Sequence, residues 1–393
     1  MLSKIEYAGG NESSFGQAAE SLRRLAELQI SGRHVGRITE RLGRERAAQR
    51  DRQVVQMQAG QLTPAHPEPP AIAVIHIDAG KVQERQEQAG PGVHQPHWSD
   101  TKVACLETYA PKADDRDPQP KPPAVFLDPP SVMRLCQEVS QVRNDPATRP
   151  TAPKPQPPAV EQVGRQTRPA RLVRTAVATM APAAAFGQMV SAEATRRGFY
   201  QAPGGAIVGD GGNWIGPLGQ ECFPDWRQIL DIVHLVTHLW TAAIAAFAGQ
   251  PKQAFSFYER LLRAAWSGQT EQVLTGLREQ LQRLGPPPAN AGADDPRRIV
   301  GGTLGYIGQN AHRMDYPQYR REGLPVSSAA VESLVKQFNH RVKGSEKFWL
   351  RGGVEAVLQV RAAYLSDDGR AEEFHHRRPR SPAAGRNRHK LVA

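Results

Sequence analysis

Residues 71–78 read AIAVIHID, a run of small and β-branched apolar residues that ends in an aspartate. Branched side chains favour an extended backbone, so this stretch predicts a buried β-strand. A second run of this kind, AIVGD at 206–210, also ends in an aspartate. Ligand sites in open α/β sheets lie at the carboxyl ends of strands. Asp78 and Asp210 are therefore candidate site residues, although a single aspartate after a strand is more often a turn former.

Further strands and long helical patterns surround these two runs. KVQERQEQ at 81–88 and TKVACLETY at 101–109 predict two more strands. Apolar spacing predicts helices over about 161–197, then from Asp225 to Leu284, and again over 297–366. A chain that mixes strands and helices in this way is predicted to have an α/β fold.

The composition points to an intracellular protein with a polyanionic partner. The chain has 393 residues and a net charge of +11, and its 50 basic residues are 39 Arg and 11 Lys. The planar guanidinium suits phosphate groups, although a GC-rich genome that encodes Arg in place of Lys would leave the same excess. Three cysteines without a CxxC pair exclude a disulfide framework and a zinc ribbon. No signal peptide or membrane-spanning run is evident, so a cytoplasmic protein is expected.

The N-terminal segment predicts a helical DNA-binding unit. Residues 16–50 follow helical spacing, with a break at Ser31-Gly32 and a short second helix after it. That second helix carries Arg33, Arg37 and Arg41, as a helix-turn-helix requires. A plain helical hairpin has the same pattern, so this alternative stays open.

Two segments have a biased composition. Residues 111–158 hold 13 of the 33 prolines, which predicts polyproline-like or loop structure with one short helix near 131–142. The tail at 370–393 is rich in Arg and has no apolar period. It is predicted to be a disordered basic arm, or a solvated end without a role.

A third candidate carboxylate lies on a late helix. Ser327-Ser328 is an N-cap signal, and the helix that it opens carries Glu332, Lys336, Asn339 and Lys343 on one face. A carboxylate followed by cations suits a metal-bound phosphodiester that runs along the helix. The alternative is a solvated Glu–Lys pair, which stabilises a helix by only a few tenths of a kcal/mol.

Three carboxylates of this kind predict a site for Mg²⁺ or Mn²⁺. Divalent ions of this class prefer oxygen ligands from a few carboxylates plus substrate phosphate. Two such ions about 4 Å apart stabilise the attacking and the leaving oxygen of a phosphoryl transfer. Without a cation, three converging carboxylates would repel one another and raise their pKa values.

Other residues suggest contacts or alternatives. Arg341 is a candidate phosphate contact, and Trp349 is a candidate for stacking on a DNA base. His234 and His238 are four residues apart and could suggest zinc, but the glutamate of an HExxH motif is missing and no third ligand is evident.

Three blocks of the chain resemble the ISKra-type insertion-sequence transposases. Residues 73–109 (AVIHIDAGKVQERQEQAGPGVHQPHWSDTKVACLETY) resemble their first-Asp segment. Residues 207–240 (IVGDGGNWIGPLGQECFPDWRQILDIVHLVTHLW) resemble their second-Asp segment. Residues 310–349 (NAHRMDYPQYRREGLPVSSAAVESLVKQFNHRVKGSEKFW) resemble the segment with the catalytic Glu. The three blocks come in the right order, and the similarity runs from about 71 to 366.

The resemblance implies a DDE transposase with an RNase H-like core and the triad Asp78, Asp210 and Glu332. It implies Mg²⁺ or Mn²⁺ as cofactor and double-stranded DNA as partner, both element ends and target, with a homo-oligomer on DNA and no membrane. Asp231-x-x-His234 is similar to a C/D-x-x-H motif of related superfamilies, with a structural role in orienting a helical insertion. The implied organisation is a DNA-binding segment at 1–60, the first core part at 71–224 with its Pro-rich insertion, a helical insertion at 225–310, the last core part at 311–366 and a basic tail at 367–393.

Two departures from this family leave rival functions open. The usual GSG-like turn before the catalytic Glu reads Ser327-Ser328-Ala329. The chain also begins almost directly at the helix-turn-helix-like segment, whereas similar transposases carry more sequence upstream, so a truncated copy is one interpretation. The rivals are an inactive DNA-binding relic and an RNase H-like nuclease without strand transfer.

Overall fold

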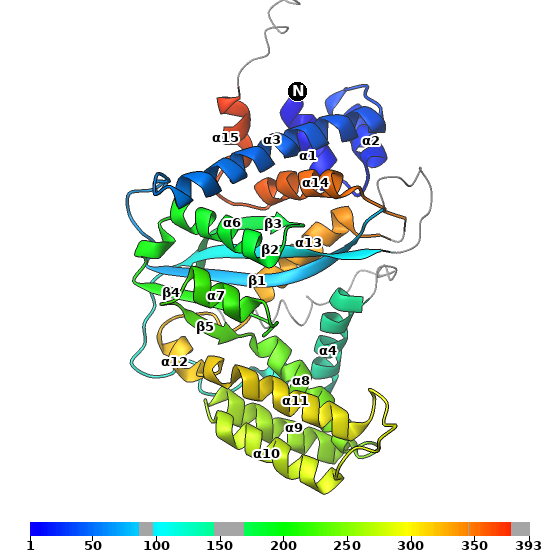
Figure 1. The fold of residues 1–393 in the computed structure, drawn as a ribbon, viewed down its shortest axis with the longest axis vertical. Coiled ribbons are helices and arrows are strands. Elements are labelled where there is room, and N and C mark those ends of the chain that lie inside the picture. Colours follow the sequence, from blue (N-terminus) through cyan, green and yellow to red (C-terminus); the bar gives the residue numbers. More distant parts are fainter. Residues whose placement is uncertain (86–96, 145–168, 345, 379–393) are drawn as a thin grey trace, which may run out of the picture.

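A five-stranded mixed sheet runs through the middle of the molecule (Figure 1). The computed structural model describes residues 1–85, 97–144, 169–344 and 346–378. The strand order is β3-β2-β1-β4-β5. The strands are β1 (Ile72–Gln83), β2 (Trp98–Tyr109), β3 (Arg171–Thr179), β4 (Gly204–Gly209) and β5 (Arg227–Leu230).

The directions of the strands divide the sheet into two halves. β1, β2 and β3 are antiparallel neighbours, whereas β4 runs parallel to β1 and β5 runs parallel to β4. Helices follow or separate the parallel strands, as parallel connections require. The predicted α/β class is therefore confirmed at the level of a mixed sheet with helices.

β1 is longer than the sequence predicted, and this changes the place of Asp78. The strand continues through Asp78 to Gln83 because β2 pairs with it along its whole length. Its pairing with β4 stops one residue before Asp78, at Ile77 opposite Gly209. Asp78 thus stands at a strand end only with respect to β4. The separate strand expected at 81–88 was wrong for residues 81–83, and residues 86–88 lie outside the described part of the chain.

Alternate residues of the strands face two different helical layers. Ala73, Ile75 and Ile77 of β1 pack against α6 (Ala183–Arg196) and α7 (Ile215–Cys222). The opposite face of the sheet packs against α13 (Ala329–Val342), α14 (Arg351–Tyr364) and α8 (Ile232–Ala246). The sheet is therefore buried on both sides, which explains its runs of apolar residues.

A helical bundle extends from the sheet at the end opposite to the N-terminal helices (Figure 1). The helices predicted within 225–310 are confirmed for most of this range, but residues 227–230 form β5 instead of helix. Trp240 and Trp266 are buried in its core. The remaining elements of this region are α9 (Pro251–Trp266), α10 (Thr270–Leu284), α11 (Pro296–Asn310), a 3-10 turn η3 (Ala311–Arg313) and α12 (Tyr316–Arg321).

Two further predictions concern the middle of the chain. The helix near 131–142 is confirmed as α4 (Pro129–Asn144), which follows the turn η1 (Ala124–Phe126). The single helix expected over 161–197 was wrong, because residues 171–179 form β3 on the edge of β2 before α6 begins, and α6 is followed by the turn η2 (Phe199–Gln201). The β-branched run in RLVRTAVAT fits this pairing. Residues 145–168, which belong to these two segments, lie outside the described part.

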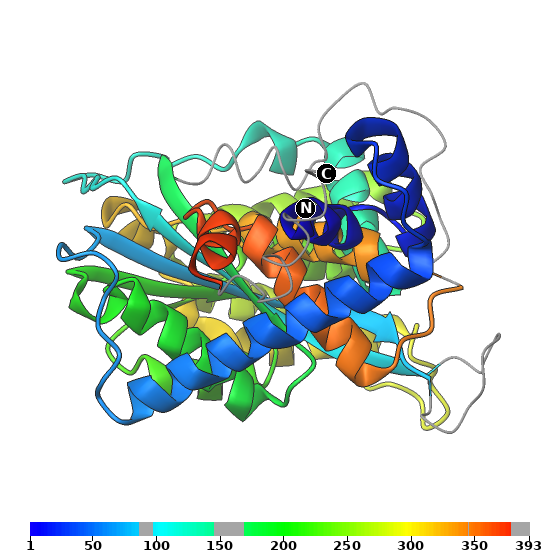
Figure 2. The same ribbon diagram turned by 90° about the horizontal axis from the view of Figure 1, so that it is seen from above.

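The N-terminal helices pack on the core, and the predicted break at Ser31-Gly32 is the start of a helix, where Ser31 is the N-cap. α3 (Gly32–Gln58) follows α1 (Leu2–Asn11) and α2 (Phe15–Ala26), and it is one helix of 27 residues instead of a short one. It runs diagonally over the molecule in the view from above, along α14 (Figure 2). At Gly43 a Cβ would lie 2.1 Å from the carbonyl oxygen of Ala356, so the two helices approach closely. Arg33, Arg37 and Arg41 are exposed on the other side of α3.

The start of the predicted basic tail is also part of the fold. Residues 370–377 form α15 (Arg370–Arg377), which corrects the expected disordered arm for this stretch. The buried carboxylate of Glu6 accepts hydrogen bonds from Arg46 at 2.7 and 2.9 Å and lies 2.7 Å from Nε2 of His375. Residues 379–393 lie outside the described part. Among the helices that are described, none has an apolar stretch long enough to cross a bilayer.

Candidate active site

Two aspartates follow the residues at which β1 and β4 stop pairing. Asp78 follows Ile77, Asp210 follows Gly209, and these preceding residues are partners in the parallel register. The Ala79 N–H donates to Oδ1 of Asp78 at 2.7 Å, and the Gly212 N–H donates to Oδ1 of Asp210 at 2.9 Å. Each carboxylate is therefore oriented by the main chain that follows it. The strand order brings Asp78 and Asp210 to the same end of the β1–β4 pair.

Glu332 approaches the same region from α13. Val331 and Val335 bury the neighbouring face of this helix against the sheet, which turns Glu332 inward. Its side chain is 2% exposed, and neither carboxylate oxygen has a hydrogen-bond partner. The interpretation of Glu332 as half of a solvated Glu–Lys pair is therefore wrong, because its carboxylate is buried away from solvent.

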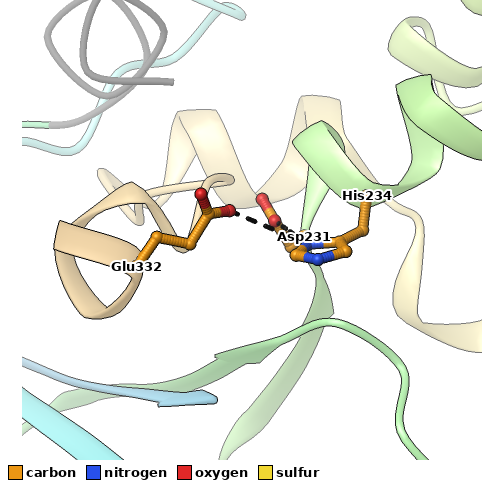
Figure 3. Close-up of side chains that lie close together, drawn as sticks. All are labelled: Asp231, His234 and Glu332. Carbon is orange, nitrogen blue, oxygen red and sulfur yellow. Dashed lines mark hydrogen bonds and ion pairs between the residues drawn. The ribbon is translucent and has the colours of Figure 1, made fainter. Parts of the chain in front are cut away.

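Asp231 and His234 form a buried pair beside Glu332 (Figure 3). Asp231 ends β5 and caps α8, and its Oδ1 accepts the Val233 N–H at 3.1 Å. Nδ1 of His234 lies 2.6 Å from Oδ2 of Asp231 and 3.9 Å from Oε1 of Glu332. His234 is thus the cationic group next to Glu332.

Asp231 also holds the beginning of α13. Its Oδ1 accepts the Ser328 N–H at 3.0 Å, and its Oδ2 accepts the Ser328 hydroxyl at 2.7 Å. The predicted N-cap residue Ser328 therefore gives its hydroxyl to another element and not to its own helix. This contact joins the start of the helical insertion to the helix of Glu332, which fits the structural role expected for Asp231 and His234.

The electrostatics of the cluster depend on burial. The pKa of Glu332 is raised to about 7, chiefly by burial and also by the charges of Asp231 and Asp78, whereas His234 and Lys336 act in the opposite direction. Burial alone would lower the pKa of His234, but the hydrogen bond to Asp231 and its charge outweigh this and raise that pKa to about 9. The positive charge of protonated His234 therefore stabilises the ionised form of Glu332 and opposes the effect of burial.

The most compact group of possible metal ligands differs from the predicted triad. Among the described residues, ligand atoms of Asp231, His234 and Glu332 all lie within 4.8 Å of one another. Asp231 already accepts four hydrogen bonds within the protein, which suits a structural anchor better than a metal ligand. Asp78 and Asp210 do not belong to so tight a group with Glu332.

Residues further along α13 lie near the outer part of the site. Lys336 and Asn339 are half-buried, and the charge of Lys336 acts on Glu332. Nζ of Lys343 lies 5.7 Å from the ring centre of Trp98 in a cation–π contact. The stripe predicted on this helix face is therefore partly open to solvent beyond Glu332.

Arg341 and Trp349 hold the N-terminal helices to the core. Arg341 is 1% exposed, donates to the Gly9 carbonyl at 2.9 Å and lies over the rings of Phe15 and Trp349. The indole of Trp349 donates to the Val342 carbonyl at 2.8 Å. Burial corrects the prediction that Arg341 contacts a DNA phosphate, because its guanidinium lies inside the protein. Trp349 is half-buried, and its stacking on a DNA base stays a prediction.

The sequence interpretation missed the residues behind Asp210. The Tyr306 hydroxyl donates to the Asp210 carbonyl at 2.8 Å, and its ring stacks on His238 at 3.8 Å. This stacking and the Asp231 contact occupy the two histidines considered for zinc. No local pattern pointed to Tyr306, because it lies 96 residues after Asp210.

We expect the metal-free protein to lose stability as the pH rises from about 4.5 to about 7. In this window the folded chain keeps a proton on Glu332 that the unfolded chain has lost, so the unfolded state is favoured by rising pH. His234 adds a loss between about 6.5 and 9, because its folded pKa is raised. Urea unfolding in EDTA at pH 5 and 7 measures the effect. Glu332→Gln should flatten the lower window, and an equal decline in that variant would contradict this origin.

No protein-family model matches the chain, and no curated protein matches it either. What the chain does is therefore inferred from its residues and their geometry.

Proposed function

We propose that the chain is a DDE-type transposase. It cleaves DNA at the ends of its element with Mg²⁺ or Mn²⁺ and joins the freed 3′-hydroxyl to target DNA. Asp78, Asp210 and Glu332 are the residues that would hold the ions.

The buried carboxylate of Glu332 is the observation that carries this proposal. Both of its oxygens lack hydrogen bonds, although the side chain is almost fully buried. A buried charge is costly unless it is paired or binds a metal. His234, at 3.9 Å, compensates it only in part, since hydrogen-bond distances are near 3 Å. The neighbouring carboxylates at the ends of the β1–β4 pairing supply the further oxygen ligands that Mg²⁺ requires.

Different residues around this site would bind the ions, orient the carboxylates and contact the DNA. Ions of this kind, when bound, polarise the phosphate and favour ionisation of the attacking hydroxyl. The main-chain N–H groups of Ala79 and Gly212 orient the two aspartates. Asp231 fixes the first turn of α13 and hence the place of Glu332. Lys336 brings a positive charge to the outer side of the site, where a DNA phosphate would lie.

The sheet supports an RNase H-like core. Three antiparallel strands are followed by two strands parallel to the first, and the acidic residues come from β1, from the end of β4 and from a late helix. The helices between β5 and α13 would then be the insertion of such a transposase.

DNA as the partner is supported by charge. The chain carries a net charge of +11, and exposed arginines line the outer side of α3. Such a surface suits the phosphate backbone, and several copies of the chain would bring two element ends together. A DNA partner of this kind would fit a location in the cytoplasm with the nucleoid.

The test uses purified protein, Mn²⁺ or Mg²⁺ and DNA that contains the sequences flanking the gene. Metal-dependent nicking followed by joining of paired ends is the expected result. Nicking without joining would indicate a nuclease, and binding without nicking would indicate an inactive relic. Either outcome would overturn the proposed transposition.

Affinity for this DNA should fall steeply with salt. Replacing Arg33, Arg37 and Arg41 together by Gln should reduce the slope of log K against log salt by about 0.9 for each DNA phosphate that these side chains neutralise. As a control of equal charge, Arg278, Arg283 and Arg298 of the insertion are also exposed. Binding measured by fluorescence anisotropy between 50 and 300 mM salt, at about five concentrations, gives both slopes. Equal reductions in the two triple variants would argue against α3 as the contact surface.

A further inference from the structure

We propose that Tyr306 is a positioning residue that sets the place of Asp210 from within the helical insertion. Tyr306 belongs to α11, and its hydroxyl donates to the main-chain carbonyl of Asp210 at 2.8 Å. This inference rests on the proposed function only in taking Asp210 as a metal ligand.

The loop after β4 is also held by its own main chain, since the Ile215 N–H donates to the Gly212 carbonyl at 3.0 Å. Asp210 stands after the last residue of the strand, and its own carboxylate turns back to accept the Gly212 N–H at 2.9 Å. The hydrogen bond from Tyr306 holds the peptide unit of Asp210 itself, which is where the direction of the side chain is decided. A shift of this peptide would carry the carboxylate with it.

Gly211 shows how closely the loop lies against α11. Its φ of +77° is in the left-handed region, where residues with a Cβ are strained. A Cβ at this position would lie 3.0 Å from Cε2 of Tyr306 and 3.1 Å from Nδ2 of Asn310. The loop therefore packs closely against these two side chains and against Leu230, whose Cδ1 would lie 2.9 Å from the same Cβ.

Contacts of half-buried rings and buried polar side chains fix Tyr306 in turn. Its ring stacks on His238 of α8 with centres 3.8 Å apart and an angle of 18°. Nδ2 of Asn310 donates to the Tyr306 carbonyl at 2.9 Å, and Nη1 of Arg313 donates to Oδ1 of Asn310 at 3.0 Å. Arg313 is 3% exposed, and its Nε and Nη2 have no hydrogen-bond partner.

Arg313 brings a positive charge close to Asp210. A guanidinium is buried at a high cost unless nearby groups compensate it. The negative charge of Asp210 acts on Arg313 at this position. The end of α11 and the turn η3 thus bring a hydrogen bond, an aromatic ring and a buried cation to the residues around Asp210.

A positioning role has a consequence that a packing role does not. Removal of the hydroxyl alone should loosen the Asp210 loop and weaken metal binding, while the insertion stays folded. Tyr306→Phe makes this change, because it keeps the ring that stacks on His238. The matched control is Tyr258→Phe, since Tyr258 also lies in the insertion and donates its hydroxyl to a main-chain carbonyl, that of Phe126, at 3.0 Å.

Two measurements on the full chain test the inference. Hydrogen–deuterium exchange without metal should become about 2- to 10-fold faster in peptides covering 209–214 in Tyr306→Phe, as expected for the loss of one neutral hydrogen bond. Mn²⁺ binding, measured by electron paramagnetic resonance of the free ion, should weaken by a similar factor. Tyr258→Phe should change neither result. Gly211→Ala, which pushes the loop away from Tyr306, should change both in the same direction.

Each outcome bears on the inference. Unchanged exchange at 209–214 in Tyr306→Phe would overturn it, and so would an equal change in Tyr258→Phe, because the effect would then be general loosening. If the wild-type chain does not bind Mn²⁺, the proposed function fails, whereas the exchange data still decide whether Tyr306 holds the loop. Faster exchange with unchanged Mn²⁺ affinity would overturn the link from the loop to the metal site.

Discussion

Asp210→Asn is expected to abolish metal-dependent nicking and strand transfer while DNA binding stays nearly intact. The amide keeps the shape of the carboxylate and can still accept the Gly212 N–H, so the loop should keep its conformation. What is lost is the charge that attracts the divalent ion. Loss of electrostatic stabilisation of this kind costs about 10²–10³ or more in rate. The measurement is cleavage of labelled element-end DNA with Mg²⁺ or Mn²⁺, next to binding of the same DNA.

Two matched variants and one control sharpen this experiment. Asp78→Asn and Glu332→Gln should have the same effect, because each removes one charge from the same proposed site. Lys336→Ala should leave slower but metal-dependent cleavage, because Lys336 lies on the outer part of the helix face. A fully active Asp210→Asn protein would show that the site is wrongly assigned.

Asp231→Ala should lower the free energy of unfolding by about 3–5 kcal/mol, which is the expected cost of removing one partner of a buried ion pair. Asp231 is fully buried, caps α8, binds Ser328 at the start of α13 and pairs with His234. Its removal leaves His234 buried, with the more distant Glu332 as the nearby negative charge. Urea unfolding of the metal-free protein at pH 7 measures the loss.

The control for this experiment is a helix cap without the buried pair. Asp295 caps α11 by accepting the Arg297 N–H at 2.8 Å, and Asp295→Ala should cost only about 1 kcal/mol. The difference between the two variants then measures what Asp231 contributes beyond capping. Equal losses would mean that the His234 pair and the Ser328 contact add little.

The sequence by itself determined the local elements that carry the site. The β-branched runs before Asp78 and Asp210 form buried strands, and the apolar period after Ser328 places Glu332 on one face of α13. Such patterns can be interpreted without a structure because a strand repeats every two residues and a helix every 3.6 residues. Which of the strands are neighbours, and hence whether the acidic residues meet, was not contained in them.

Only the tertiary structure decided what each polar side chain does. Arg341 has a side chain that suits a phosphate contact, but Phe15 and Trp349 from distant segments pack against it. Residues 370–377 have no apolar period, but the buried Glu6 gives their His375 a partner. Tyr306 reaches Asp210 across 96 residues of chain. Burial and ion pairing depend on segments that are distant along the chain. A local period in the sequence shows which face of an element is apolar, but it does not identify those distant partners.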